Sequence, residues 1–152
     1  MSLKTDIIFV KALRSNAELM AQLPAGDVYN TTIPVPDEEL DNAPVPYVIV
    51  TFDGLENSDF TKDGYEGCTD TVQIGIEIAA DNRDQLAQLT TCIRQTIREY
   101  FENAQPSDED YNLVPLGYTF TASPVRWSEK PCYAQTLNYK CDTTPDVEPS
   151  ES

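Results

Sequence analysis

The hydrophobic pattern of the chain changes its period once, inside the stretch from Thr69 to Phe101. In the first part every second residue is apolar, as in a strand with one buried face; Val72, Ile74, Ile76 and Ile78 alternate with Thr71, Gln73, Gly75 and Glu77. In the second part the apolar residues recur at spacings of three and four, as on one face of a helix: Leu86, Leu89, Ile93, Ile97 and Tyr100. The pattern predicts a half-buried strand over Thr69–Ala80 that runs into a helix folded back over it.

Capping residues mark the start of this helix. Asp81 or Asn82 suits the N-cap, and Asp84 or Gln85 suits the reciprocal position of a capping box. Asn103, followed by a proline, marks the end of the helix.

The rest of the pattern predicts one more helix and several strands. These are a helix over Ser2–Leu23, a short strand at Val28–Thr32, a strand at Tyr47–Phe52 ended by Asp53-Gly54, a strand from Gly117 to Pro124 and a last strand at Cys132–Cys141. The proline-rich segment Pro34–Pro46 reads as an extended acidic arm. This order predicts an α+β fold, a mainly antiparallel sheet with two helices packed on one face. We expect one domain over residues 1–144 and a disordered acidic C-terminal tail over 145–152.

The composition is strongly acidic. The chain has 26 acidic and 10 basic residues and no histidine, which gives a formal net charge of −16. Such a chain should repel nucleic-acid phosphates and anionic membranes. Between Asp37 and Asp70 the acidic residues are opposed only by Lys62. One interpretation is a solvated surface that keeps the protein soluble. Others are a docking face for a basic partner, or a lining past which DNA slides.

The cysteines and the N-terminus exclude some classes. Cys68, Cys92, Cys132 and Cys141 form no CxxC pair and have no histidine companions, so the usual zinc spacings are missing and free thiols are expected. Cys132 and Cys141 should lie on opposite faces of one strand. No signal peptide and no membrane span is predicted.

The segment Asp59–Asp70 imitates a calcium loop. Its acidic and hydroxyl residues occupy the first, third, fifth and twelfth places and Gly64 the sixth. However, Glu66 stands where an apolar residue is usual, Asp70 is short for bidentate binding, and the flanks are predicted strands. An ordinary acidic hairpin loop is the alternative.

Signals for catalysis are few. The obvious carboxylate clusters, Asp37–Glu39 and Asp108–Asp110, lie in predicted loops beside prolines, where solvent keeps them ionised. Nucleophile elbows, P-loops and dinucleotide glycine patterns are absent. We therefore expect no enzyme, no cofactor and no metal site, and we expect the C-terminal aromatic residues to pack in the core or at interfaces rather than stack on bases.

The order of these pieces resembles the tail-completion, or tail-terminator, proteins of long-tailed bacteriophages and their prophages. The resemblance rests on an N-terminal helix, the proline-flanked strand PYVIVTF, a variable loop, the strand and helix TVQIGIEIAADNRDQLAQL, and a closing strand CYAQTLNYKC. It covers roughly Leu3 to Cys141 and is best from Thr71 to Ile97. The acidic segment Pro34–Pro46 and the long stretch between Glu102 and Val114 depart from it.

This resemblance implies a structural protein that forms a ring, commonly hexameric, at the head-proximal end of the tail. Its partners would be other copies of itself, the tail tube protein and the head-completion protein, first in the host cytoplasm and then in the virion tail. The expected contact residues lie in the loop after the YVIVTF strand and in the acidic arm: Asp53, Glu56, Asp59, Phe60, Lys62, Asp63, Tyr65 and Glu66, with Asp37, Glu38 and Glu39. The alternatives are a stand-alone acidic module that binds a basic protein or a small ligand, and a calcium-binding protein or metal-dependent enzyme.

Overall fold

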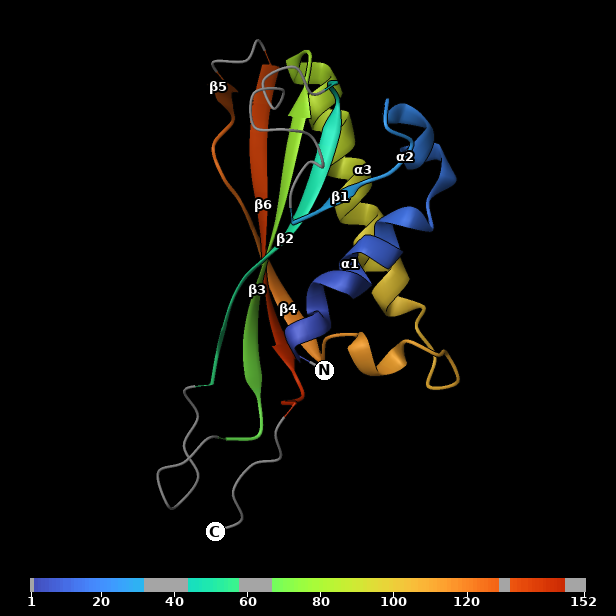
Figure 1. Cartoon of the computed structure of the whole chain (residues 1–152), viewed down its shortest axis with the longest axis vertical. Helices are drawn as coiled ribbons and strands as arrows, with labels where there is room; N and C mark the ends of the chain where they lie inside the picture. The colour runs from blue at the N-terminus through green and yellow to red at the C-terminus, as the bar shows by residue number, and fades with distance from the viewer. Residues whose placement is uncertain (1, 32–43, 58–66, 129–131, 147–152) are drawn as a thin grey trace.

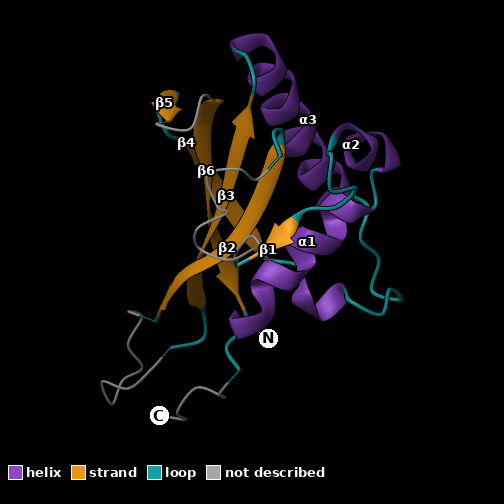
Figure 2. Ribbon diagram, turned by 45° about the horizontal axis from the view of Figure 1, so that its top comes forward, coloured by secondary structure: helices purple, strands orange, loops and turns teal. Residues whose placement is uncertain are grey.

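One curved sheet carries helices on one of its faces (Figures 1 and 2). The computed structural model describes residues 2–31, 44–57, 67–128 and 132–146. Within them the helices are α1 (Thr5–Arg14), α2 (Ala17–Gln22) and α3 (Arg83–Glu102), with 3-10 turns η1 (Ser2–Lys4) and η3 (Tyr111–Leu113). The strands are β1 (Tyr29–Asn30), β2 (Tyr47–Glu56), β3 (Asp70–Ala80), β4 (Gly117–Ala122), β5 (Arg126–Ser128) and β6 (Cys132–Thr143).

The described strands form one six-stranded sheet in the order β1-β2-β3-β6-β4, with β5 also paired to β6. All pairs are antiparallel except β1 with β2. The expected mainly antiparallel α+β fold is therefore confirmed. The face opposite the helices is called the open face below.

The register lines the strands up in rows across the sheet. One row runs through Phe52, Ile74, Tyr139 and Phe120. The next row runs through Thr51, Gly75, Asn138 and Thr121. Because side chains alternate between faces, the first row points to the helices and the second to the open face.

The predicted single helix over Ser2–Leu23 is wrong, because the chain breaks at Ser15 and Asn16. Ser15 Oγ donates to the carbonyl of Ala12 at 2.6 Å, and Asn16 Oδ1 accepts from the backbone N–H of Leu19 at 3.1 Å. Asn16 is the N-cap of α2, with an extended backbone. The side-chain oxygen of Asn16 thus starts a second helix where periodicity alone suggested continuation.

The predicted end of β2 at Asp53-Gly54 is also wrong. The register against β3 shifts between Phe52 and Gly54, which is a β-bulge, and Gly54 has a φ of 157°. A bulge at a glycine lets a strand bend and continue. β2 therefore runs on to Glu56.

The strand-to-helix junction after β3 matches the prediction. Asn82 is the N-cap of α3, and its Oδ1 accepts from the backbone N–H of Gln85 at 2.8 Å. Gln85 Oε1 in return accepts from the N–H of Asp81 at 3.0 Å. α3 ends at Glu102 and lays its apolar face on the sheet.

The core lies between the helices and the sheet and includes an aromatic cluster. Tyr139 is 1% exposed and contacts the rings of Phe9, Tyr118 and Phe120 in tilted or edge-on arrangements, at centroid distances of 5.1, 5.4 and 5.2 Å. Among the described residues its hydroxyl is the one buried side-chain oxygen without a hydrogen-bond partner. Burial raises the pKa of Tyr139 far above the usual value of a tyrosine.

The first residues of the described chain are tied to the end of β6. Ser2 Oγ and Thr143 Oγ1 lie 2.6 Å apart, and Ser2 Oγ also donates to the carbonyl of Thr144 at 2.9 Å. Both segments therefore lie at the same end of the sheet. Residues 147–152 lie outside the described residues, so the predicted tail stays a prediction.

Candidate interaction surfaces

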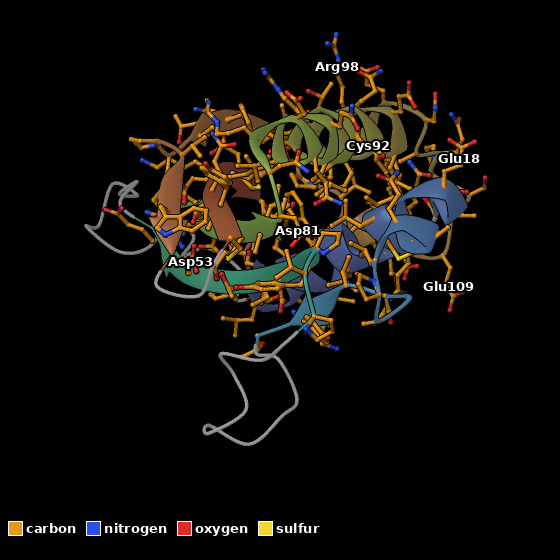
Figure 3. All side chains as sticks on the ribbon, turned by 90° about the horizontal axis from the view of Figure 1, so that it is seen from above. Glu18, Asp53, Asp81, Cys92, Arg98 and Glu109 are labelled. Atoms are coloured by element: carbon orange, nitrogen blue, oxygen red, sulfur yellow. The ribbon has the colours of Figure 1, made fainter. Side chains whose placement is uncertain are left out.

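Asp53 and Glu56 are the two predicted contact residues that the structure describes, and both lie on β2 beyond the point where β1 pairs with it. Thr51 Oγ1 donates to Asp53 Oδ1 at 2.7 Å. A β-carbon placed on Gly75 would clash with Asp53 Oδ2 and would lie 2.8 Å from Thr51 Oγ1. The bulge therefore turns Asp53 inward over the open face, above a glycine that leaves room for it (Figure 3).

The other predicted contact residues lie outside the described residues. They are Asp59, Phe60, Lys62, Asp63, Tyr65 and Glu66 in the loop, and Asp37, Glu38 and Glu39 in the acidic arm. Their role in contacts stays a prediction.

The two ends of the β2–β3 loop are held together by Asn57. Its Nδ2 donates to the carbonyl of Gly67 at 3.2 Å and to Asp70 Oδ1 at 3.0 Å, and its Oδ1 accepts from the N–H of Gly67 at 2.9 Å. Asp70 is 5% exposed. The buried carboxylate of Asp70 thus helps to close the loop by accepting this hydrogen bond. This arrangement does not support a role for Asp70 as a calcium ligand.

The open face is polar over the same half of the sheet. β3 places Thr71 and Gln73 there, β6 places Asn138 and Lys140 there, and β4 adds Thr119. Further along, Arg126 Nη2 of β5 contacts Glu77 Oε1 of β3 at 2.7 Å, so this ion pair crosses β6. Hydroxyl and amide groups in rows suit a wet or hydrogen-bonded contact surface.

A groove of about 750 Å³ lies between the helices and the segment that leads to β4. Acidic side chains from three parts of the chain line it: Glu18 of α2, Glu99 of α3, and Asp108, Glu109 and Asp110. Figure 3 shows Glu18 and Glu109 on the same side of the molecule. The groove also has apolar lining, including Ile8, Tyr100 and Val114. The groove therefore gathers several negative charges in one concave surface instead of spreading them over the exterior.

One cation of the protein already contacts this acidic segment. Lys11 Nζ of α1 lies 2.8 Å from Asp110 Oδ2. The hydrogen bond with Asp110 raises the pKa of Lys11. The pairing joins α1 to the turn before η3 and shows that a lysine side chain fits at this rim.

Sequence reasoning identified Asp108–Asp110 as a carboxylate cluster but missed the groove. Glu18 and Glu99 carry no signal of their own, because acidic residues on exposed helix faces are ordinary. Only the packing of α2 against α3 brings them to the same cavity. The helix N-cap contributes to this packing, since Asn16 Nδ2 donates to Thr96 Oγ1 of α3 at 2.9 Å.

The described part of the chain contains no group of three or more cysteine, aspartate or glutamate side chains placed to hold a metal ion. The four cysteines are free; Cys68 is exposed, Cys92 is half-buried, and Cys132 and Cys141 are buried. Cys141 belongs to the core under the helices, and Cys132 lies on the opposite face of β6, as predicted. None of the described helices is long and apolar enough to cross a membrane.

No family model and no curated protein matches the sequence. Solved structures do match the fold. One is a chain of a structure titled the virion of a native gene transfer agent particle, with a TM-score of 0.56, 12% identity, and coverage of 90% of this chain and 92% of the other. At this identity the likeness concerns the fold, and it extends over nearly the whole of both chains.

Proposed function

We propose that this chain is a structural protein of a phage-like particle, of the tail-completion type, that forms a ring at the head-proximal end of the tail and joins the tail to the head. The observation that carries the proposal is the fold likeness to a virion chain over 90% of this sequence. The partners in this proposal are further copies of the chain, a tail tube protein and a head-completion protein. Assembly takes place in the host cytoplasm, and the protein then stays in the particle without a catalytic role.

The surfaces of the molecule agree with this role. A polar open face, strand edges without a partner among the described strands, and an acidic groove are features through which a protein acts by contact. With a net charge of −16, a ring of this protein would not retain passing DNA.

Two experiments test the proposal. Electron microscopy of the purified protein and of particles from its host should show closed rings, and antibodies against the chain should label the head–tail junction. Particles produced without the gene should have unjoined heads and tails, and a plasmid copy should restore them. Normal particles from the deletion strain would exclude the proposed role.

A second candidate, a binding module for a basic protein or a small ligand, is favoured by the acidic groove. Its lining combines five carboxylates, of which Asp110 is already paired with Lys11, with apolar side chains, as expected for a site that takes a lysine or arginine side chain with its aliphatic stem. Titration with a lysine-rich peptide at two salt concentrations tests this function. The triple variant Glu18→Gln, Glu99→Gln, Glu109→Gln should bind the peptide at least tenfold more weakly. Equal binding of the peptide by the variant and the parent would exclude the groove as the binding site.

A further inference from the structure

The two halves of the sheet differ in whether their edge strands are paired with another strand. In one half, β1 pairs with β2 at Ile49 and Val50, and β5 covers β6 at Cys132–Ala134. In the other half, the outer edge of β2 from Thr51 to Glu56 and the outer edge of β4 have no partner strand among the described residues.

These two free edges span the same rows. Phe52 and Phe120 end one row, and Thr51 and Thr121 end the next. β2 and β4 also run in opposite directions, because each strand from β2 through β3 and β6 to β4 is antiparallel to its neighbour. If a second copy continued the sheet, β4 of one molecule would meet β2 of the next as an antiparallel pair.

The backbone groups on the two edges match as well. Val50 O accepts from Thr31 N at 2.8 Å, so the backbone N–H and C=O groups of Val50 point to the outer edge of β2. These groups alternate in direction along a strand, so those of Phe52 also point outward. On β4, Ser123 N donates inward to Thr136 O at 2.8 Å, so the groups of Phe120 face outward. Phe52 and Phe120 can therefore form a hydrogen-bonded pair between two copies.

Side chains on the helix side of the two edges are apolar. β4 presents Tyr118 and Phe120, and β2 presents Phe52 and Leu55, whose side chain is 40% exposed. Such cross-strand pairs stabilise an antiparallel contact. β4 also lacks the charges and prolines with which proteins usually block a free edge.

We propose that copies of this chain associate head to tail through antiparallel pairing of β4 with the Thr51–Glu56 half of β2, so that the sheet continues from one copy to the next. This inference rests on the proposed ring and names the surfaces that close it. The contact is heterologous, using two different edges, and such contacts close into rings when the rotation between neighbours permits.

A disulfide experiment tests the pairing directly. In a Cys68→Ser background, Thr51→Cys and Thr121→Cys in one chain lie three strand spacings, roughly 14 Å, apart, too far for a bond within the molecule. Between paired copies they are neighbours across the new ladder. Oxidation should give a ladder of crosslinked species on non-reducing gels that ends at the ring size. A mixture of the two single variants should stop at dimers.

A second variant weakens the contact without a crosslink. The backbone groups of Val50 face outward, so those of Thr51 and Gly75 face each other; beyond the bulge those of Gly54 and Gln73 do the same, and the N–H of Leu55 therefore points away from β3 within the proposed contact. Leu55→Pro should shift the sedimentation of the protein toward the monomer by removing this outward donor, whereas Leu55→Val should assemble like the parent. Circular dichroism establishes that both variants are folded.

The outcomes separate this inference from the proposed function. Rings seen by microscopy without crosslinks in the double-cysteine variant would overturn the edge pairing and leave the function standing. Crosslinked rings together with normal particles from the deletion strain would support the pairing and exclude the function. A chain that stays monomeric at millimolar concentration and forms no crosslinks would also overturn the pairing.

Discussion

The carboxylate of Asp53 occupies the space above Gly75 that a β-carbon would need. Gly75→Ala should therefore displace Asp53 and break its 2.7 Å hydrogen bond with Thr51. We expect a loss of about 1 kcal/mol in the free energy of unfolding, measured by urea denaturation. In a Thr51→Ala, Asp53→Ala background, which lacks both side chains that the β-carbon would meet, the same change should cost little, since alanine suits a strand better than glycine. An equal cost in both backgrounds would show that these two side chains do not restrict Gly75.

The Asn57 amide closes the loop between β2 and β3, so its loss should loosen that loop. Asn57→Ala removes the partner of the buried Asp70 carboxylate and should lower the free energy of unfolding by about 1–2 kcal/mol. Hydrogen exchange at the Gly67 amide should become faster, because its acceptor is lost. Asn138→Ala, an exposed change on the open face, is the matched control. Unchanged exchange at Gly67 would contradict the role of Asn57.

The unpaired hydroxyl of Tyr139 predicts that Tyr139→Phe stabilises the protein. Folding buries this hydroxyl without a partner, and removing it abolishes that desolvation cost. We expect a gain of about 1 kcal/mol in the free energy of unfolding and a higher melting temperature. Tyr111→Phe, at a side chain 40% exposed, should change neither. A loss of stability in Tyr139→Phe would mean that the hydroxyl has a partner in solution.

Alkaline pH should destabilise the fold. Burial raises the pKa of Tyr47 to about 12, that of Cys141 to about 12 and that of Tyr139 still further, while unfolded tyrosine and cysteine lose their protons near pH 10 and pH 8.5. Between about pH 9 and 12 the unfolded state therefore binds fewer protons than the native state, and stability falls as the pH rises. Urea titrations across this range should show the decline, and Tyr139→Phe should make it shallower. A flat profile would contradict the burial of these groups.

The thiols should react in an order set by their exposure. Cys68 is exposed, whereas Cys132 and Cys141 are buried and burial favours the neutral thiol of Cys141. A thiol reagent such as Ellman's reagent should modify Cys68 quickly, and the buried pair only after unfolding in guanidinium. Cys68→Ser should remove the fast phase. Rapid modification of Cys141 in the native protein would show that the core opens locally.

The parts of the fold that were predictable are those fixed by local periodicity. The alternation from Val72 to Ile78 and the helical spacing after Leu86 gave β3 and α3 nearly to the residue, because each apolar position reports burial on one face. The N-cap at Asn82 followed from side-chain chemistry that acts within three residues.

The errors come from residues whose effect depends on tertiary context. Asn16 ends one helix and begins another partly because its amide also binds Thr96 of α3. Asp53-Gly54 looked like a turn, yet pairing with β3 carries β2 through it as a bulge. The groove was missed for the same reason, since its carboxylates come from segments about 80 residues apart that packing brings together.

The position of β6 governs how the chain can be made. This strand is the last described element, yet it lies between β3 and β4 and pairs along residues 70–80 and 117–122. During synthesis the ribosome must therefore release residue 143 before the middle of the sheet can form, and until then β3 lacks one of its two neighbouring strands and α3 lacks its contact with β6. A chain that stops before Cys132 would lose the centre of its sheet rather than an edge, and the host's chaperones are expected to bind such a fragment.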